Sequence, residues 1–231
     1  MKKVFLIICI AFMAITVFAQ DNFFVYKADG STAKFVISEV DSISFIAPPP
    51  TTGVENGYEW VDLGLPSGLK WATCNIGANS PEKYGSYFSW GETSTKNYYM
   101  ESYYSYSETP LVLPLNNDAA HVKMGGSWRM PTATDKNELR DNCTWTWTTN
   151  YNNTGVVGVI VTSKKNSNHL FFPAAGRYYN VLKDAGSFGY YWLSTSSLSY
   201  ASILCFRNGN PIVVNTNNPN CYGLTIRGVC P

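Results

Sequence analysis

The C-terminal part of the chain holds the residues whose types best suit noncovalent recognition. From 207 to 223 it reads RNGNPIVVNTNNPNCYG, in which six of seventeen residues are asparagine. An asparagine amide offers two donors and an acceptor without charge, and tyrosine adds a large contact area with few rotatable bonds. The predicted ligand-binding residues are Tyr190, Tyr191, Ser196, Tyr200, Asn208, Asn210, Asn215, Asn217, Asn218 and Tyr222.

Backbone turns are the competing interpretation of these asparagines. Asn208 and Gly209 form a strong hairpin signal because both residues tolerate a positive φ. Asn217 and Asn218 stand before Pro219 in a predicted loop. Turn formation alone and turn formation with ligand contact both stay open, and Trp192 is predicted to lie in the core.

Catalytic chemistry has few candidate residues. His121 and His169 are the two histidines, and no nucleophile stands at a recognisable spacing from either. The sequence has no Gly-x-Ser-x-Gly, His-Glu-x-x-His or phosphate-loop motif. No sequence rule pairs any two carboxylates for glycoside hydrolysis; the candidates are Glu59, Asp62, Glu92, Asp118 and Asp135. We therefore predict no catalytic residue, no metal ligand and no cofactor.

The N-terminus predicts export. Lys2 and Lys3 precede an apolar run from residue 4 to 17, and Val-Phe-Ala stands before Gln20 as a cleavage site. This pattern is that of a signal peptide over 1–19, too short to span a membrane. The expected destination is the periplasm, the cell surface or the medium. Loss of both lysines changes the net charge from +1 to −1. A chain without excess positive charge is not expected to bind nucleic acid.

The cysteines then suggest disulfides. Cys9 leaves with the signal, and five others remain in a compartment that permits disulfides. Up to two bridges can form among them, in fifteen arrangements that the sequence does not distinguish. The five are Cys74, Cys143, Cys205, Cys221 and Cys230.

Turn signals divide the rest of the chain. Residues 20–46 predict a β-hairpin appendage with strands at 23–27 and 33–37, and 47–57 predict a proline-rich linker. The main domain is expected over 58–231, and it begins with a hairpin that turns at 66–68. Residues 75–115 predict a long packed loop region rich in aromatic residues.

Helices and further strands follow this loop region. Helices are predicted at 117–124, starting after Asn116 or Asn117, and from Thr132 to Asn142 with a capping box that includes Asp135. Strands are predicted at 145–148, 156–163, 169–173, 190–194, 201–207, 211–215 and 222–228. The fold class is therefore α+β.

Six phrases in order carry a family resemblance: YEWVDLGLPSGLKWATCNIGA, YGSYFSWGET, GGSWRMPTATDKNEL, FFPAAG, GYYWLSTS and CYGLTIRGV. Over residues 58–230 the chain resembles the Fibrobacter succinogenes major paralogous domain family, common in secreted proteins of Bacteroidota. That family is similar to the formylglycine-generating enzyme and sulfatase-modifying factor group. The resemblance implies a C-type lectin-like fold: a twisted, mostly antiparallel sheet, two helices and long loops on one side.

Two functional sites known from similar proteins, a calcium-dependent sugar site and a copper-binding cysteine pair, are not expected in this sequence. Calcium-dependent sugar sites need acidic ligands, yet no acidic side chain follows Asp184. Backbone carbonyls or acidic side chains within 82–135 stay candidate ligands of a structural ion. The residues around Cys221 and Cys230 do not match the copper-binding cysteine motif of the formylglycine-generating enzymes.

The sequence therefore leaves three candidate functions. The first is an exported, non-catalytic binding module that presents its C-terminal face to a glycan or a surface protein. The second is a structural surface subunit that self-assembles through residues 21–46. The third is an oxidase related to the formylglycine-generating group.

Overall fold

The computed structural model describes residues 21–27, 30–40, 51–197, 200–213 and 218–231, with no side chains described for 210–213. The chain divides into two compact units, Met1–Pro49 and Pro50–Pro231. In the first unit, β1 (Asn22–Tyr26) pairs antiparallel with β2 (Thr32–Val36), followed by a short 3-10 turn, η1 (Ile37–Glu39). The rings of Phe23 and Phe35 stack across the pair, with centroids 5.0 Å apart. The predicted hairpin is confirmed there, although Asp29 of its turn lies outside the described residues.

The second unit begins with a four-stranded sheet of order β14-β5-β4-β3. Its strands are β3 (Thr52–Glu55), β4 (Tyr58–Asp62), β5 (Lys70–Ala72) and β14 (Val229–Cys230). The predicted hairpin turn at 66–68 is confirmed by the hydrogen bond from the Gly68 N–H to the Leu65 carbonyl, 2.9 Å.

The linker prediction over 47–57 is wrong for its second half. Residues 52–55 form β3 and pair with β4. Between the two strands, Asn56 and Gly57 adopt positive φ angles of 48° and 83°, which suit a tight hairpin turn. The Asn-Gly dipeptide was the sequence signal for this hairpin, and the prolines before it obscured the signal.

Two three-stranded antiparallel sheets form most of the remainder. The first has β6 (Cys143–Thr148), β7 (Gly158–Ser163) and β8 (His169–Pro173); the second has β11 (Phe188–Ser197), β12 (Tyr200–Arg207) and β13 (Asn210–Val213). A small hairpin of β9 (Arg177–Tyr179) and β10 (Val181–Lys183) lies between them in the chain. These strands confirm the predicted ones apart from their ends, although residues 214 and 215 of the predicted strand 211–215 lie outside the described residues. The β9–β10 hairpin is not among the predicted strands.

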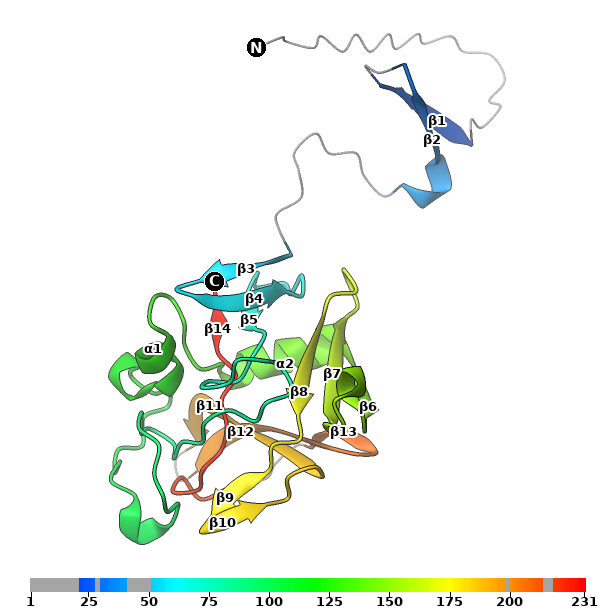
Figure 1. Cartoon of the computed structure of the whole chain (residues 1–231). Helices are drawn as coiled ribbons and strands as arrows, with labels where there is room; N and C mark the ends of the chain where they lie inside the picture. Colours follow the sequence, from blue (N-terminus) through cyan, green and yellow to red (C-terminus); the bar gives the residue numbers. More distant parts are fainter. Residues whose placement is uncertain (1–20, 28–29, 41–50, 198–199, 214–217) are drawn as a thin grey trace. The chain divides into compact units, whose positions relative to one another are not determined.

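The predicted strand at 222–228 is wrong as a single regular strand. Successive residues pair with different segments instead: Gly223 with Tyr178, Leu224 with Phe88, and Thr225 with Tyr191. Regular pairing is confined to β14, and the segment runs through the middle of the second unit (Figure 1). The segment 222–228 contacts Tyr191 and so covers the edge of β11 that does not pair with β12. The backbone groups of the segment are satisfied by several neighbouring segments instead of by one strand.

Both helices form close to the expected positions. Helix α2 (Ala133–Asn142) has the predicted capping box between Thr132 and Asp135. Helix α1 (Ala119–Met124) is capped by Asp118 rather than by an asparagine, because the carboxylate of Asp118 accepts hydrogen bonds from the N–H groups of both His121 and Met130. Short 3-10 turns, η2 (Glu101–Tyr103), η3 (Leu115–Asn117) and η4 (Tyr151–Asn153), complete the elements. The fold is mixed α+β, with mostly antiparallel sheets and two helices.

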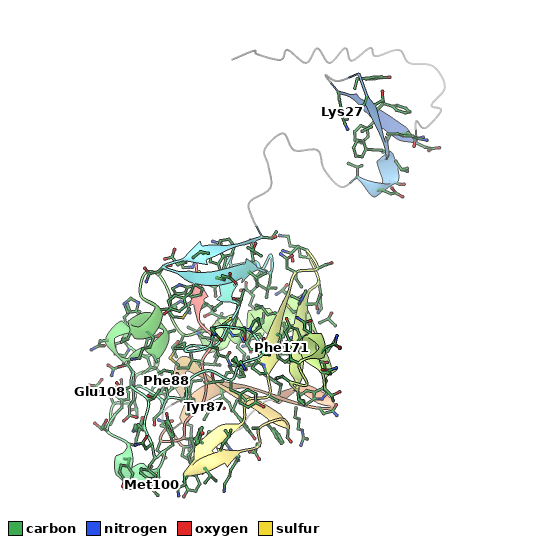
Figure 2. The ribbon with its side chains drawn as sticks, in the orientation of Figure 1. Lys27, Tyr87, Phe88, Met100, Glu108 and Phe171 are labelled. Carbon is green, nitrogen blue, oxygen red and sulfur yellow. The ribbon has the colours of Figure 1, made fainter. Side chains whose placement is uncertain are left out.

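Aromatic side chains fill the interior of the second unit (Figure 2). Trp192 is fully buried and its indole N–H donates to the Phe88 carbonyl, 2.8 Å, which confirms its predicted place in the core. Trp71, Trp90 and Trp128 are buried to the same degree. A core of this size explains how a region with few regular elements, 75–115, is held in place.

The predicted disulfides are not seen. Cys74, Cys143, Cys221 and Cys230 are free thiols in the structure, and Cys205 is fully buried. Burial raises the pKa of the thiols of Cys143, Cys221 and Cys230 to about 11. These three cysteines therefore act as small apolar core residues that stay protonated at neutral pH.

Candidate functional site

The three predicted binding residues of β11 are buried, which removes them from an exposed binding face. The Tyr191 hydroxyl donates to the Pro173 carbonyl, 2.8 Å, and Ser196 donates to the Pro110 carbonyl, 2.6 Å. Tyr190 is 5% exposed, and burial raises its hydroxyl pKa to about 12. The sequence did not distinguish these positions because nearly every residue of β11 is buried on both sides of the strand.

The other predicted residues divide into accessible, buried and undescribed positions. Asn208 is exposed at its hairpin turn, Tyr200 is 43% exposed, and Tyr222 is half-buried. Asn218 is fully buried. Asn210 belongs to β13 but its side chain is not described, and Asn215 and Asn217 lie outside the described residues.

The side chain of Arg177 contacts three of the predicted binding residues. Its guanidinium lies over the rings of Tyr190 and Tyr222, at 4.8 and 5.6 Å from their centroids. Its Nη1 donates to the Asn218 Oδ1, 2.6 Å, and its Nε lies 3.2 Å from Asp184 Oδ2. One arginine at the start of the β9–β10 hairpin thus ties the C-terminal segment to β11.

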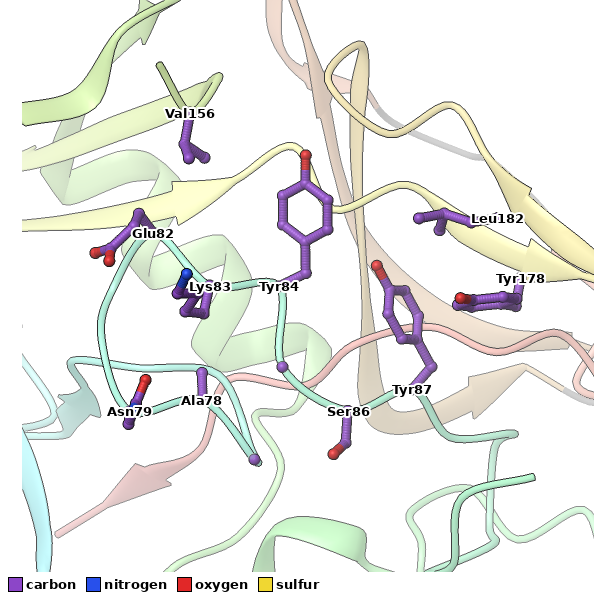
Figure 3. Close-up of a pocket in the computed structure, with 12 residues that line it drawn as sticks. Ala78, Asn79, Glu82, Lys83, Tyr84, Ser86, Tyr87, Val156, Tyr178 and Leu182 are labelled. Carbon is purple, nitrogen blue, oxygen red and sulfur yellow. The ribbon is translucent and has the colours of Figure 1, made fainter. Parts of the chain in front are cut away.

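A second site, which the sequence did not predict, lies on the other face of the same hairpin. It is an open pocket of about 790 Å³, shown in Figure 3 and called here the tyrosine pocket. Its lining residues are Gly77, Ala78, Asn79, Glu82, Lys83, Tyr84, Gly85, Ser86, Tyr87, Val156, Tyr178 and Leu182.

Two glycines close the loop that forms one side of this pocket. The N–H of Ser86 donates to the Ile76 carbonyl, 2.7 Å, across the base of the 77–85 loop. Gly77 and Gly85 have φ angles of 77° and 75°. A Cβ on Gly85 would stand 2.5 Å from the Ile76 carbonyl oxygen, and one on Gly77 would stand 2.3 Å from Ser86 Oγ. Both positions therefore require glycine.

A buried arginine fixes the floor of the pocket. The carbonyl of Tyr84 accepts hydrogen bonds from Asn75 Nδ2 and Thr225 Oγ1, each 2.9 Å. Asn75 Oδ1 in turn accepts from the Nε of Arg227, 2.8 Å, and Arg227 is fully buried. The backbone that presents the Tyr84 ring is thus held by a network that solvent does not reach.

Tyrosines form the opposite wall. Tyr87 packs edge-on against Tyr178, with centroids 4.8 Å apart and planes at 82°. Its hydroxyl donates to the Ala175 carbonyl, 2.6 Å, and burial raises its pKa well above the usual range. Tyr178 exchanges two backbone hydrogen bonds with Gly223, 2.8 and 3.0 Å, and pairs in register with Leu182. Tyr178 and Leu182 therefore face the pocket together from neighbouring strands.

Polar groups without protein partners surround these rings. Among the described residues, the Asn79 amide, the Lys83 ammonium and the Tyr178 hydroxyl make no hydrogen bond or ion pair within the protein. Glu82 accepts from Ser80 Oγ, 2.5 Å, which lowers its pKa together with the Lys83 charge. The pocket thus combines apolar ring surface with available donors and acceptors, the usual composition of a small-molecule site.

Groups suited to bond-breaking chemistry are dispersed. His121 Nδ1 lies 3.1 Å from the Trp128 carbonyl oxygen beside α1, and His169 is exposed at the start of β8. Across the described part of the chain, no three His, Cys, Asp or Glu side chains are grouped so as to hold a metal ion. Arg129 pairs with Asp135 at 2.7 Å and thereby supports the start of α2.

The sequence predicts the aromatic-rich region 75–115, but not the site that its Tyr84 and Tyr87 help to form. The missed signal was the pair of glycines eight residues apart, Gly77 and Gly85, around a polar loop. Tyr178 comes from a hairpin that was not predicted, so its approach to Tyr87 was not visible in the sequence.

Within the described residues, no helix is long and apolar enough to cross a membrane. Comparisons of this chain with protein-family models, with curated proteins and with solved structures found no match.

Proposed function

We propose that this protein is an exported, non-catalytic module that binds an extracellular ligand, a glycan or a surface protein. The observation that supports this most is the β9–β10 hairpin, which carries tyrosines on both faces. Tyr178 faces the tyrosine pocket, and Tyr179 packs on Tyr222 with ring centroids 4.8 Å apart. Tyrosine-rich surfaces with neighbouring amides are typical of adaptable binding sites.

Of the residues predicted for the C-terminal face, Tyr200, Asn208 and Tyr222 are accessible among those described. Tyr200 and Asn208 lie at opposite ends of β12, so we propose a narrower face around Tyr222 and Arg177. We also propose that the second unit has a C-type lectin-like fold of the Fibrobacter succinogenes major paralogous domain type. Two helices, antiparallel sheets and the long region 75–115 support this assignment, and the motif order in the sequence supports the family.

Binding arrays test the function. The chain from residue 20 would be applied to a glycan array and to an array of extracellular proteins, each with calcium and with a chelator. We expect ligand binding that calcium does not alter and a ligand that is recovered chemically unchanged. Chemical conversion of a bound ligand, or no binding on either array, would contradict the proposal.

One observation favours the structural alternative. The N-terminal hairpin exposes large apolar side chains, with Tyr26 80%, Phe24 46% and Phe35 42% exposed, and a two-stranded hairpin is marginally stable alone. Assembly through these strands predicts a concentration-dependent oligomer that disappears in a Phe24→Ser/Tyr26→Ser variant. A monomer at all concentrations in sedimentation experiments would remove this alternative.

The oxidase has less support. Redox and metal-binding cysteines need a lowered thiol pKa, whereas burial raises the pKa of Cys221 and Cys230 to about 11. We therefore do not propose this activity for the chain.

A further inference from the structure

We infer that the tyrosine pocket binds a neutral oligosaccharide. This inference rests on the proposed binding function and assigns a ligand class to one face of the β9–β10 hairpin. The pocket is bounded by the 77–85 loop on one side and by Tyr178 and Leu182 on the other (Figure 3).

The aromatic walls suit sugar rings. The face of an aromatic ring carries partial negative charge and attracts the weakly positive C–H groups of a pyranose, while the hydroxyls at the ring rim remain free to bond. Tyr84 and Tyr178 are both half-buried, so each has ring surface left uncovered. The Tyr87 hydroxyl is engaged by the Ala175 carbonyl, which leaves Tyr87 to support Tyr178 rather than to bond a ligand.

The polar groups are of the kind that hydroxyls need. A sugar hydroxyl both donates and accepts, and each group that faces it must supply the complement or remain unpaired. The Asn79 amide supplies both functions, the Lys83 ammonium donates, and the Tyr178 hydroxyl does either. None of the three makes a hydrogen bond or ion pair with another described residue.

Charge favours a neutral ligand over an acidic one. Glu82 and Lys83 are neighbours in the lining and offset each other's charge, and among the described residues no second cation lines the pocket. A site for uronic acids or sulfated sugars needs an excess of arginine or lysine to offset the ligand charge.

Size and accessibility favour a chain over a single sugar. Small-molecule sites enclose roughly 300–1,000 Å³, and this pocket has about 790 Å³. The pocket is open to solvent rather than enclosed, so an oligosaccharide can extend past its ends. The glycine-closed loop and the Arg227 network hold the walls before the ligand arrives, which reduces the entropy lost on binding.

Calorimetric titration with defined oligosaccharides tests the inference. The probes are hexamers of β-1,4-glucose, β-1,4-xylose, β-1,4-mannose and α-1,4-glucose, with a hexamer of galacturonate as the acidic comparison. We expect at least one neutral hexamer to bind and the acidic one not to bind. Tyr178→Ala and Tyr84→Ala should each weaken that binding about tenfold, the loss of one stacking contact.

Matched variants separate the pocket from the wider proposal. Tyr98→Ala removes a tyrosine that is 53% exposed and outside the pocket, and it should leave the affinity unchanged. Far-ultraviolet circular dichroism and the melting temperature confirm that each variant is folded. Binding lost in Tyr222→Ala but retained in Tyr178→Ala and Tyr84→Ala would overturn the pocket assignment and leave the binding function standing. Binding of the acidic hexamer alone, or of proteins but no hexamer, would overturn the ligand class.

Discussion

Arg227 is a buried cation whose hydrogen-bond partners are all neutral. Its guanidinium donates to the carbonyls of Ala72, Thr73 and Phe171 and to Asn75 Oδ1, at 2.6 to 3.0 Å, and lies over the Phe172 ring. Burial lowers its pKa, yet arginine stays charged because its ordinary pKa is above about 12. Three chain segments that are distant in sequence therefore meet at one side chain.

Removal of this side chain should destabilise the fold. Arg227→Met leaves several buried acceptors without donors, and we expect a loss of about 2–4 kcal/mol in the free energy of unfolding, measured by urea denaturation. Arg207→Met, at an exposed position, is the control and should change it by less than about 0.5 kcal/mol. Equal effects of the two substitutions would refute the role given to Arg227.

The thiols give a second test at the scale of single residues. Cys74 is half-buried, whereas Cys143, Cys221 and Cys230 are buried with pKa values raised to about 11. Only the thiolate reacts with alkylating reagents. We expect iodoacetamide at neutral pH to label Cys74 first in the native protein and the other three only after unfolding, as read by peptide mass spectrometry. Disulfide-linked peptides from the purified native protein would contradict the free thiols.

At the scale of elements, the 77–85 loop depends on its glycines for two separate reasons. Gly85 has a positive φ, and a Cβ there would also meet the Ile76 carbonyl oxygen. Gly68 has nearly the same φ, 74°, but a Cβ there would have nothing within 4 Å. Comparison of the two sites separates backbone strain from steric overlap.

We expect Gly68→Ala to cost about 1 kcal/mol, the strain of a left-handed residue alone. Gly85→Ala should cost clearly more and should also weaken oligosaccharide binding, because the loop must move to accept the methyl group. Unfolding curves and calorimetric titration of both variants provide the check. Equal stability with unchanged binding in the two variants would show that the loop is not rigid.

The start of α2 should respond to acid. Burial alone would raise the pKa of Asp135, but hydrogen bonds from Arg129 and Thr132 and the Arg129 charge lower it overall. A lowered folded-state pKa means that this stabilisation is complete above the unfolded value, about 4, and is lost as the pH falls through the folded value.

Asp135→Asn should therefore lower stability by about 1 kcal/mol at about pH 7, and the gap to the unmodified protein should narrow toward about pH 3. The measurement is the urea midpoint across this range. Asp141→Asn is the control, because Asp141 pairs with Arg140 at the surface and its side chain is 59% exposed. A stability difference between Asp135→Asn and the unmodified protein that grows as the pH falls would contradict the lowered pKa of Asp135.

Local signals in the sequence predict individual helices, strands and turns, but they do not predict the contacts between segments that are distant in the chain. The Thr132 capping box, the turn at 66–68 and the strand at 169–173 each depend on adjacent residues, and the structure has all three. The segment 222–228 depends on three distant partners, so its alternating residue types suggested a strand that does not form. The tyrosine pocket has the same origin, because Tyr84 and Tyr178 come from separate parts of the chain.

At the scale of the whole molecule, the second unit holds both proposed recognition surfaces on one small hairpin. The Arg177 side carries Tyr179 and Tyr222, and the opposite side faces the tyrosine pocket. Few charges and many aromatic rings distinguish both surfaces from a nucleic-acid or polyanion site. The first unit, β1 and β2 with their exposed rings, is the part of the chain to which the assembly alternative applies.

Hydrogen–deuterium exchange of the chain from residue 20, with and without a saturating neutral hexamer from the titration, tests the central claim most directly. The account predicts slower exchange on binding within residues 77–87 and 177–183, the two walls of the tyrosine pocket. It predicts no change within 100–108, where Tyr103 is exposed and lies outside the pocket. Protection confined to 100–108, or no protection anywhere at saturation, would contradict it.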